Sequence, residues 1–217
     1  MYKGMCECFS IPATSALPVF VEGDSDTLGQ RVFSRRDFVG LKMEYAGKPV
    51  LMLGIHLKAG FLVAMKDSDG KNLPMFDQLS AADGLIRSEF FRFAQARKAR
   101  EVIDGFLIEN PNGEVVAAGD FNARDGDVPL RIVQGVLKGT DDSLGDAADW
   151  LPESERISFG GRKLVDHILL SSRMAGGIHG VRILSQGEKP AKDVSPTPTA
   201  IGSDHPPLVV EIEIKAV

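Results

Sequence analysis

The stretch "VVAAGDFNARDGD", residues 115–127, is an apolar run that ends abruptly in polar residues. Asp120 and Asn122 place a carboxylate and a carboxamide two residues apart at the end of an expected strand. Gly, Asp and Asn are the usual turn residues, so a turn is the simpler interpretation when the motif is taken alone. The other strand ends of the chain favour a functional site.

Three further apolar segments carry unexpected polar residues at or near one end. They are "GIHLKAG" with His56, "VDHILL" with Asp166, and "IGSDHPP" with Asp204 and His205. Each has a structural interpretation of its own, as an edge histidine, a turn cap or an Asx-turn. Burying an uncompensated carboxylate is costly, however, so these side chains can satisfy one another only if they converge in one cleft.

This set of side chains suits one kind of chemistry. Carboxylate and carboxamide oxygens are hard ligands for Mg²⁺ or Mn²⁺, whereas thiolates are missing from the set. A histidine beside an aspartate is an oriented general base, and a second histidine can donate to a phosphate oxygen. Together they indicate metal-assisted hydrolysis of a phosphate ester by water. A serine hydrolase is disfavoured because the sequence has no G-x-S-x-G motif, and structural zinc because the ligands are mostly oxygen.

The elements that position these residues follow from hydrophobic periodicity. Residues 38–45 alternate as a strand does, residues 46–48 predict a turn, and the apolar run 50–57 predicts a strand covered on both faces. Residues 60–84 read as a loop rich in Asp, Gly and Lys. A stripe of apolar residues at three- and four-residue steps predicts a helix over 88–109, which should pack outside a sheet through Ala99, Ile103 and Phe106.

The rest of the chain alternates short strands with polar segments. Strands are expected at 114–118 and in "KLVDHILLSS", "VRILS" and "HPPLVVEIEI", with a polar acidic stretch at 139–156. One clear helix among many strands indicates an α+β layered fold. His167, next to Asp166, should point to the opposite face of its strand and serve stability rather than chemistry.

Composition limits the partners. The 217 residues are 43% hydrophobic and carry a net charge of −5, which allows one sizeable core and provides no obvious basic face for long nucleic acid. The cluster Arg92, Arg97, Lys98 and Arg100 reads as the solvated face of the expected helix. Cys6 and Cys8 read as reduced thiols. No run is long enough to span a bilayer and no secretory signal is visible, so a cytoplasmic protein is expected.

At this point the sequence resembles a known family. The motifs "HLKAG", "GDFNAR", "VDHILLSS" and "GSDHPPLVV", in this order and roughly this spacing, resemble the endonuclease/exonuclease/phosphatase superfamily, the deoxyribonuclease-I-like group. The resemblance runs from about residue 30 to the C-terminus. It implies a single domain over 1–217, with 1–30 unassigned, folded as a four-layer α/β/β/α sandwich of two mixed β-sheets.

The resemblance also implies roles for the acid–base residues. His56 resembles the phosphate-contacting histidine that acts as an acid toward the leaving or a non-bridging oxygen. Asp166 resembles the aspartate that orients the catalytic histidine, and His205 resembles the general base itself. Pro206 disfavours the helical region for His205 and so keeps the backbone extended there.

Metal ligands and partners follow in the same way. Asp120 and Asn122 resemble the pair that positions the attacking water or metal and binds phosphate, and Asp204 resembles a metal ligand. The expected cofactor is Mg²⁺ or Mn²⁺, held by Asp120, Asn122 and Asp204. The expected partner is a phosphate-ester substrate, with nucleic acid and nucleotides as the candidate classes.

The chain departs from the family at its start. Family members open with a strand carrying an Asn and then a strand ending in Gln-Glu, whose carboxylate is the main metal ligand, and nothing before His56 matches these motifs. We therefore expect an N-terminally truncated domain. Two functions stay open: an active phosphoric ester hydrolase, or a catalytically silent domain of the same fold that binds phosphate or a partner. The two motif histidines and three motif aspartates favour the first.

Overall fold

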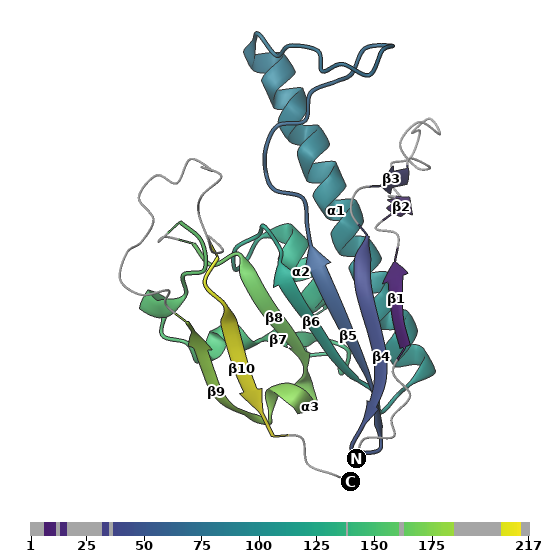
Figure 1. Cartoon of the computed structure of the whole chain (residues 1–217), viewed down its shortest axis with the longest axis vertical. Helices are drawn as coiled ribbons and strands as arrows, with labels where there is room; N and C mark the ends of the chain where they lie inside the picture. Colours follow the sequence, from purple (N-terminus) through teal and green to yellow (C-terminus); the bar gives the residue numbers. More distant parts are fainter. Residues whose placement is uncertain are drawn as a thin grey trace.

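The computed structural model describes residues 7–11, 14–16, 32–34, 37–137, 139–160, 163–184 and 205–213 (Figure 1). Its elements in chain order are β1 (Glu7–Ile11), β2 (Thr14–Ala16), β3 (Val32–Ser34), β4 (Phe38–Tyr45), β5 (Lys48–His56), α1 (Gln78–Glu109), β6 (Glu114–Asp120), α2 (Val128–Gln134), β7 (Leu144–Asp146), the 3₁₀ turns η1 (Ala147–Trp150) and η2 (Glu153–Glu155), β8 (Asp166–Ser171), α3 (Ser172–Ala175), β9 (Ile178–Ile183) and β10 (Leu208–Ile212).

A six-stranded mixed sheet, in the order β1-β4-β5-β6-β8-β7, forms the centre of the fold. The hairpin β4–β5 is confirmed, and it turns on Ala46 and Gly47, whose φ angles are +53° and +76°. Strands β5 and β6 are parallel and are joined through α1, whereas β8 returns antiparallel to β6. The C-terminal ends of β5 and β6 and the start of β8 therefore lie together at one end of the strands, which is called the sheet edge below.

Helix α1 covers one face of this sheet. Ala99, Ile103 and Phe106 are at most 4% exposed and pack in the main core, as expected from their spacing. The helix nevertheless begins at Gln78, within the stretch that the sequence predicted as a loop. Asp77 caps it by accepting a hydrogen bond from Ser80 N at 2.7 Å.

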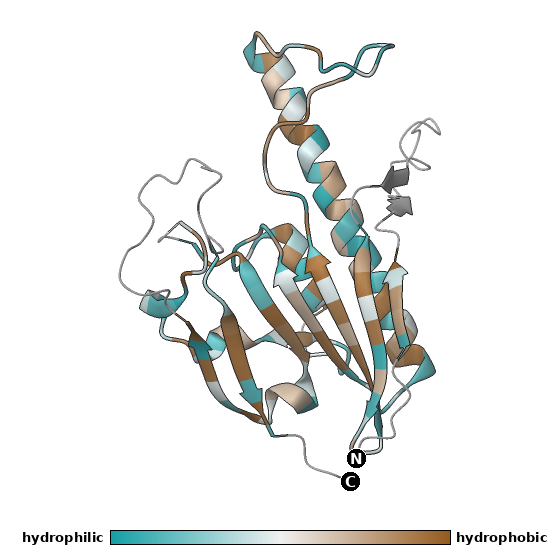
Figure 2. Cartoon of the chain, in the orientation of Figure 1, coloured by the Kyte–Doolittle hydropathy of each residue, from teal (hydrophilic) through white to brown (hydrophobic). Residues whose placement is uncertain are grey.

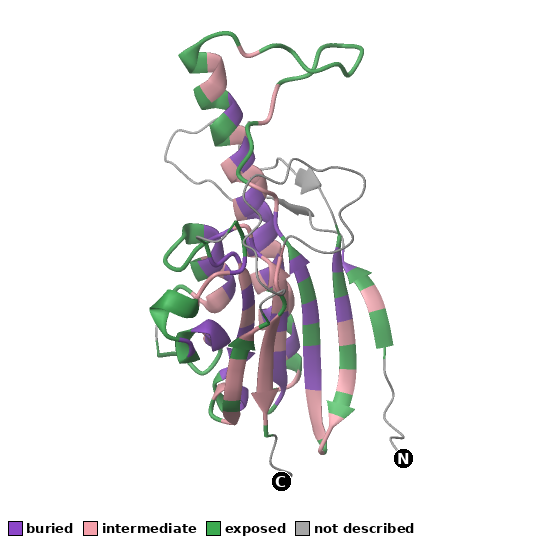
Figure 3. Ribbon diagram, turned by 60° about the vertical axis from the view of Figure 1, so that its left-hand side comes forward, coloured by how far each residue is buried: buried purple, intermediate pink, exposed green. Residues whose placement is uncertain are grey.

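The N-terminal part of α1 rises beyond the edge of the sheet, and the chain segment before it folds back along it (Figures 1 and 3). We call residues 59–87 the arm. Val63 N donates to Gly84 O at 3.0 Å, and Arg87 Nε donates to Val63 O at 2.8 Å. The arm is largely exposed, so its helical part has no continuous buried stripe from which the sequence could have predicted it.

A two-stranded sheet, β9 with β10, packs on the other face of the large sheet. Val181 and Val210 contribute to a second core cluster around Val50, Leu170 and Met174. Figure 2 shows hydrophobic residues concentrated on the strands of both sheets. A mixed sheet with a second, smaller sheet is the α+β arrangement expected of a deoxyribonuclease-I-like fold. Within the ranges described above, α1 contacts β5 and α2, and α3 contacts β6, β7 and β8.

Three details differ from the expectations. Strand β5 is not covered on both faces, because Met52 is 41% exposed on the side that faces the small sheet. The previously unassigned residues 7–11 form the edge strand β1, paired with β4. The polar stretch 139–156 contains β7 and the buried Ala147 and Ala148 of η1. No helix among the described residues is long and apolar enough to cross a membrane.

Candidate active site

Three of the expected site residues form a row across neighbouring strands. His56 ends β5, Asp120 ends β6 and Asp166 begins β8. In the ladders His56 lies opposite Asp120, and Asp120 lies opposite Asp166. Residues far apart in the sequence are therefore side by side at one edge of the large sheet.

His205 completes this edge from the segment that leads into β10. Its Nδ1 lies 2.7 Å from Asp166 Oδ2, and the two side chains are 25% and 20% exposed. A carboxylate can only accept, so Nδ1 carries the proton and Nε2 is the basic nitrogen of the neutral ring. The ring of Phe159 packs on the imidazole, with the centroids 4.8 Å apart.

The position of Asp166 is fixed by a loop residue that the sequence did not single out. Ser158 is fully buried, and its Oγ accepts hydrogen bonds from Val165 N and Asp166 N, both at 3.1 Å. Neither Ser158 nor Phe159 belongs to a periodic apolar pattern. Both support the Asp166–His205 pair from outside the strands.

Asp120 and Asn122 form a tight hydrogen-bonded turn. Asn122 N donates to Asp120 Oδ1 at 2.8 Å, and Asn122 Nδ2 donates to Asp120 Oδ2 and Leu57 O, both at 3.0 Å. Asn122 has a φ of +48°, which asparagine tolerates better than most residues. His56 Nε2 lies 3.6 Å from Asp120 Oδ2. The motif is therefore a turn, as its residue types indicate, and the turn presents the carboxylate beside His56.

His167 points to the other face of β8, as expected, and is 1% exposed. Its Nδ1 lies 2.5 Å from Asp146 Oδ2 and its Nε2 lies 2.9 Å from Ala123 O. Burial alone would lower the pKa of His167, but the hydrogen bond and charge of Asp146 outweigh it and raise the pKa. Both partners are acceptors, so the doubly protonated ring satisfies both, and it anchors the chain just after Asn122.

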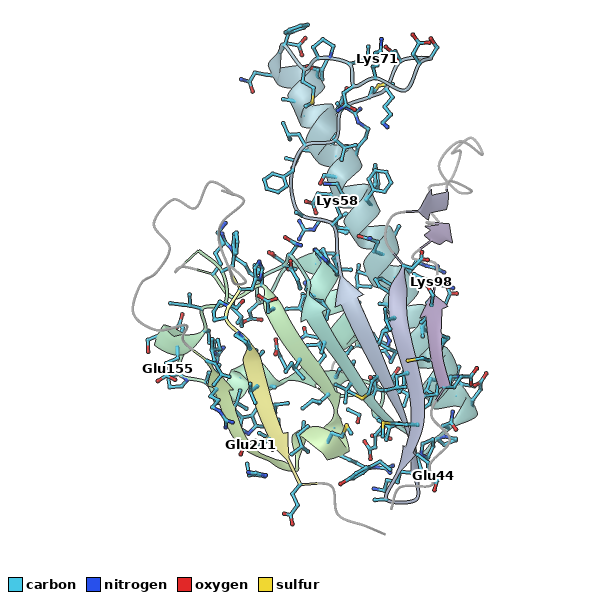
Figure 4. The ribbon with its side chains drawn as sticks, viewed as in Figure 1. Glu44, Lys58, Lys71, Lys98, Glu155 and Glu211 are labelled. Atoms are coloured by element: carbon cyan, nitrogen blue, oxygen red, sulfur yellow. The ribbon has the colours of Figure 1, made fainter. Side chains whose placement is uncertain are left out.

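Two cationic side chains near the site, Lys58 and Arg92, donate hydrogen bonds to other groups of the protein. Lys58 lies where the arm meets the end of β5, and its Nζ donates to Ala59 O, Phe61 O and Ser88 Oγ (Figure 4). Arg92 is only 8% exposed. The interpretation of Arg92 as part of a solvated helix face is therefore wrong.

A cavity of about 220 Å³ opens beside the histidine–aspartate pair. Apart from the side chains of that pair, its walls are mostly apolar, and they come from β6, β8 and the segment that leads into β10: Ala118, Gly119, Ile168, Pro206, Pro207 and Leu208. The cavity lies against the face of the large sheet that carries the small sheet. It can accept a small group next to His205.

Two of the three expected metal ligands, Asp120 and Asn122, lie within the described residues. Asp204, one of the three expected ligands, lies outside the described residues, which themselves contain no group of three His, Cys, Asp or Glu side chains that could hold a metal ion. Asp120 and Asn122 provide one carboxylate and one amide oxygen at the sheet edge. Mg²⁺ commonly binds through one or two carboxylates while retaining several waters, so these oxygens are compatible with a hydrated Mg²⁺.

Comparison with known proteins supports the fold. No family model matches the sequence, and no curated protein matches it. Among solved structures, an endonuclease/exonuclease/phosphatase protein from Bacteroides vulgatus aligns over 98% of this chain and 67% of its own, at 14% identity and a TM-score of 0.52. A family protein from Leptotrichia buccalis aligns over 96% of this chain and 60% of its own, at 13% identity and a TM-score of 0.49. The human Nocturnin catalytic domain aligns over 82% and 51%, at 16% identity and a TM-score of 0.47.

The alignment with the Bacteroides vulgatus protein shows the fold of the chain and not its activity. The chain has the fold of the endonuclease/exonuclease/phosphatase proteins, as the four sequence motifs predicted. It spans about half of the Nocturnin domain's length and three fifths of the Leptotrichia buccalis protein's length.

Proposed function

We propose that the chain is a divalent-metal-dependent hydrolase of phosphate esters, in which His205 is the general base and Asp166 orients it. The observation that carries the proposal is the 2.7 Å hydrogen bond between these residues, at the same sheet edge as His56 and Asp120. A hydrogen-bonded histidine and aspartate beside a second histidine and a carboxamide suit the attack of water on a phosphate.

The reaction divides between the two histidines. His205 Nε2 takes a proton from the attacking water as the new P–O bond forms, and the Asp166 carboxylate stabilises the resulting imidazolium. The bond from phosphorus to the leaving oxygen breaks, and His56 in its charged form gives that oxygen a proton. His56 is placed for this role at the end of β5, where its Nε2 lies 3.6 Å from Asp120 Oδ2.

Asp120 and Asn122 position the phosphate and the metal. The turn between them holds the Asn122 amide and the Asp120 carboxylate in one arrangement, so neither has to be ordered during the reaction. A Mg²⁺ held by these two residues, with Asp204, would neutralise charge on the phosphate oxygens. The proton transfers are made by the side chains of His205 and His56.

The substrate class is a phosphate ester presented on a small molecule, a nucleotide or a nucleic-acid end. The net charge of −5 disfavours non-specific wrapping of duplex nucleic acid, because such binding depends on the neutralisation of many phosphates. The cavity beside His205 can accept the group on one side of the scissile bond.

The test is hydrolysis of a phosphodiester and a phosphomonoester by the purified chain, with bis(p-nitrophenyl) phosphate and p-nitrophenyl phosphate as probes. Mononucleotides and a short single-stranded oligonucleotide follow as natural substrate classes. We expect turnover with Mg²⁺ or Mn²⁺ and its loss when a chelator is added, because the donor oxygens suit hard cations.

Turnover that persists in chelator would show that the metal assignment is wrong. A chain that turns over none of these esters but still binds inorganic phosphate would support the alternative, a silent domain of this fold.

A further inference from the structure

We propose that Arg92 and Gln95 of α1 are positioning residues that hold the two loops of the active site in register. The structural part of the proposal rests on the hydrogen-bond geometry of α1, and its catalytic consequence rests on the proposed function. Both side chains lie within the helix rather than in the site motifs. Arg92 is 8% exposed and Gln95 is 1% exposed.

The ladder between β5 and β6 continues past the ends of the two strands. Leu57 N donates to Asp120 O at 2.9 Å, and Asn122 Nδ2 donates to Leu57 O at 3.0 Å. These bonds join the loop after β5 to the loop after β6. Beyond them the chain after β5 leads into the arm and the chain after β6 leads to α2, so the next backbone groups of the two loops, Lys58 N and Asn122 O, have other partners.

Helix α1 binds those next groups. Gln95 Oε1 accepts a hydrogen bond from Lys58 N at 2.8 Å, and Arg92 Nη2 donates to Asn122 O at 2.7 Å. One helix therefore contacts each loop through one buried side chain. The polar atoms are matched to the backbone: an acceptor meets an N–H group, and a donor meets a carbonyl.

The location on α1 explains why polar side chains are buried there. Arg92 and Gln95 are three residues apart and therefore lie on one face of the helix. That face continues into Ala99 and Ile103, which pack on the sheet. Where the helix passes the sheet edge, the same face meets loop backbone, and an apolar side chain would leave the amide and the carbonyl unpaired.

The contact with Asn122 bears directly on the geometry of the site. Asn122 has a positive φ. Arg92 donates to the carbonyl of Asn122, and the side-chain amide of Asn122 donates to Asp120. Loss of the guanidinium would let this peptide reorient and move the carboxamide and carboxylate. Misplacement of a reacting group by about 1 Å can lower a rate on the order of a hundredfold.

A purely structural role for Arg92 is the competing explanation, and α1 contains a matched control. Arg92 also pairs with Glu89 at 2.7 Å. Arg100 lies on the same helix with a side chain 12% exposed, pairs with Asp104, and donates to Val133 O at 3.4 Å. It joins α1 to α2, whereas Arg92 joins α1 to the site loop. Removal of either side chain removes a buried link between α1 and backbone.

The experiment compares Arg92→Met, Gln95→Leu and Arg100→Met in the full chain. Hydrogen exchange is followed by mass spectrometry in peptides that cover 57–61 and 119–127, and kcat and KM are measured on the ester that the parent chain turns over. Thermal unfolding of each variant is recorded first, because removing either arginine also removes the ion-pair partner of Glu89 or Asp104 and can lower stability. Arg92→Lys, which keeps the charge and one donor, serves as the conservative variant.

We expect exchange over 119–127 to rise several-fold in Arg92→Met and exchange over 57–61 to rise in Gln95→Leu, while Arg100→Met matches the parent in both peptides. We expect kcat of Arg92→Met to fall on the order of tenfold to a hundredfold with little change in KM, and Arg92→Lys to recover part of it.

Unchanged exchange in Arg92→Met, or a rise equal to that in Arg100→Met, would overturn the positioning role. So would raised exchange with kcat within about twofold of the parent. If the parent chain turns over no ester, the proposed function fails, and the exchange comparison alone decides whether Arg92 and Gln95 hold the two loops.

Discussion

Asp120 and Asp166 are direct cross-strand partners in the antiparallel ladder between β6 and β8. Like charges in such positions destabilise a sheet unless other groups compensate them. Here Asp166 is hydrogen-bonded to His205, and Asp120 to Asn122. The compensating groups are the other residues of the proposed site, so the pair links the stability of the sheet edge to its chemistry.

The first prediction follows from this pair. Asp166→Asn removes one of the two facing charges and keeps the shape of the side chain. We expect the free energy of unfolding in urea to stay within about 1 kcal/mol of the parent or to rise, because the lost repulsion offsets the weakened bond to His205. Ester hydrolysis should fall substantially, because a neutral amide cannot stabilise the imidazolium. A variant that is both less stable and fully active would contradict this account.

A second prediction concerns the close approach of β5 and β6 just before Asp120. Gly119 has a φ of +141°, and a Cβ there would lie 2.0 Å from Ile55 O. Gly119→Ala should therefore destabilise the chain by about 3 kcal/mol or more. Gly70 is the control, because it also has a positive φ, +78°, but has nothing within 4 Å of the added Cβ. Gly70→Ala should cost about 1 kcal/mol, and equal losses at the two positions would exclude the steric explanation.

The third prediction concerns pH and the buried pair of His167 and Asp146. The folded state raises the pKa of His167 above its ordinary value of about 6.5, mainly because the Asp146 hydrogen bond and charge outweigh burial. The stabilising contribution of the pair is therefore complete below that pH and is lost as the pH rises through the raised pKa. Urea unfolding of the parent and of His167→Leu should be measured from below pH 6.5 to above the raised pKa. The difference between their free energies of unfolding should become smaller as the pH increases. A difference that stays constant would show that His167 is not charged in the folded state.

Much of the fold could be predicted because a helix or strand that is buried on one side has apolar residues at regular spacings in the sequence. The hairpin over 38–57 and the stripe through Ala99, Ile103 and Phe106 are each buried on one side, and periodicity detects that pattern. The row of His56 and Asp120 could be expected because apolar strands rarely end in charged groups without a reason. The arm could not be predicted, because its exposed helical turns lack such a stripe.

The supporting residues of the site were missed for a different physical reason. Arg92 belongs to a basic cluster on a helix, and such clusters usually face solvent. It is buried because α1 extends past the end of the sheet and meets loop backbone there, which is a property of the tertiary structure. Ser158 was missed because a single hydroxyl in an aperiodic loop gives no pattern.

The most direct test of the central claim is the effect of His205→Ala on the initial rate of Mg²⁺-dependent bis(p-nitrophenyl) phosphate hydrolysis. His179→Ala is the matched control, because His179 lies on β9 with a side chain 60% exposed and pairs only loosely with Glu211 at 3.8 Å. We predict a loss on the order of a hundredfold to ten-thousandfold for His205→Ala, as expected for a general base, with the folded state of the parent retained and full activity in His179→Ala. A rate for His205→Ala within a few-fold of the parent would contradict the assignment of His205 as the base.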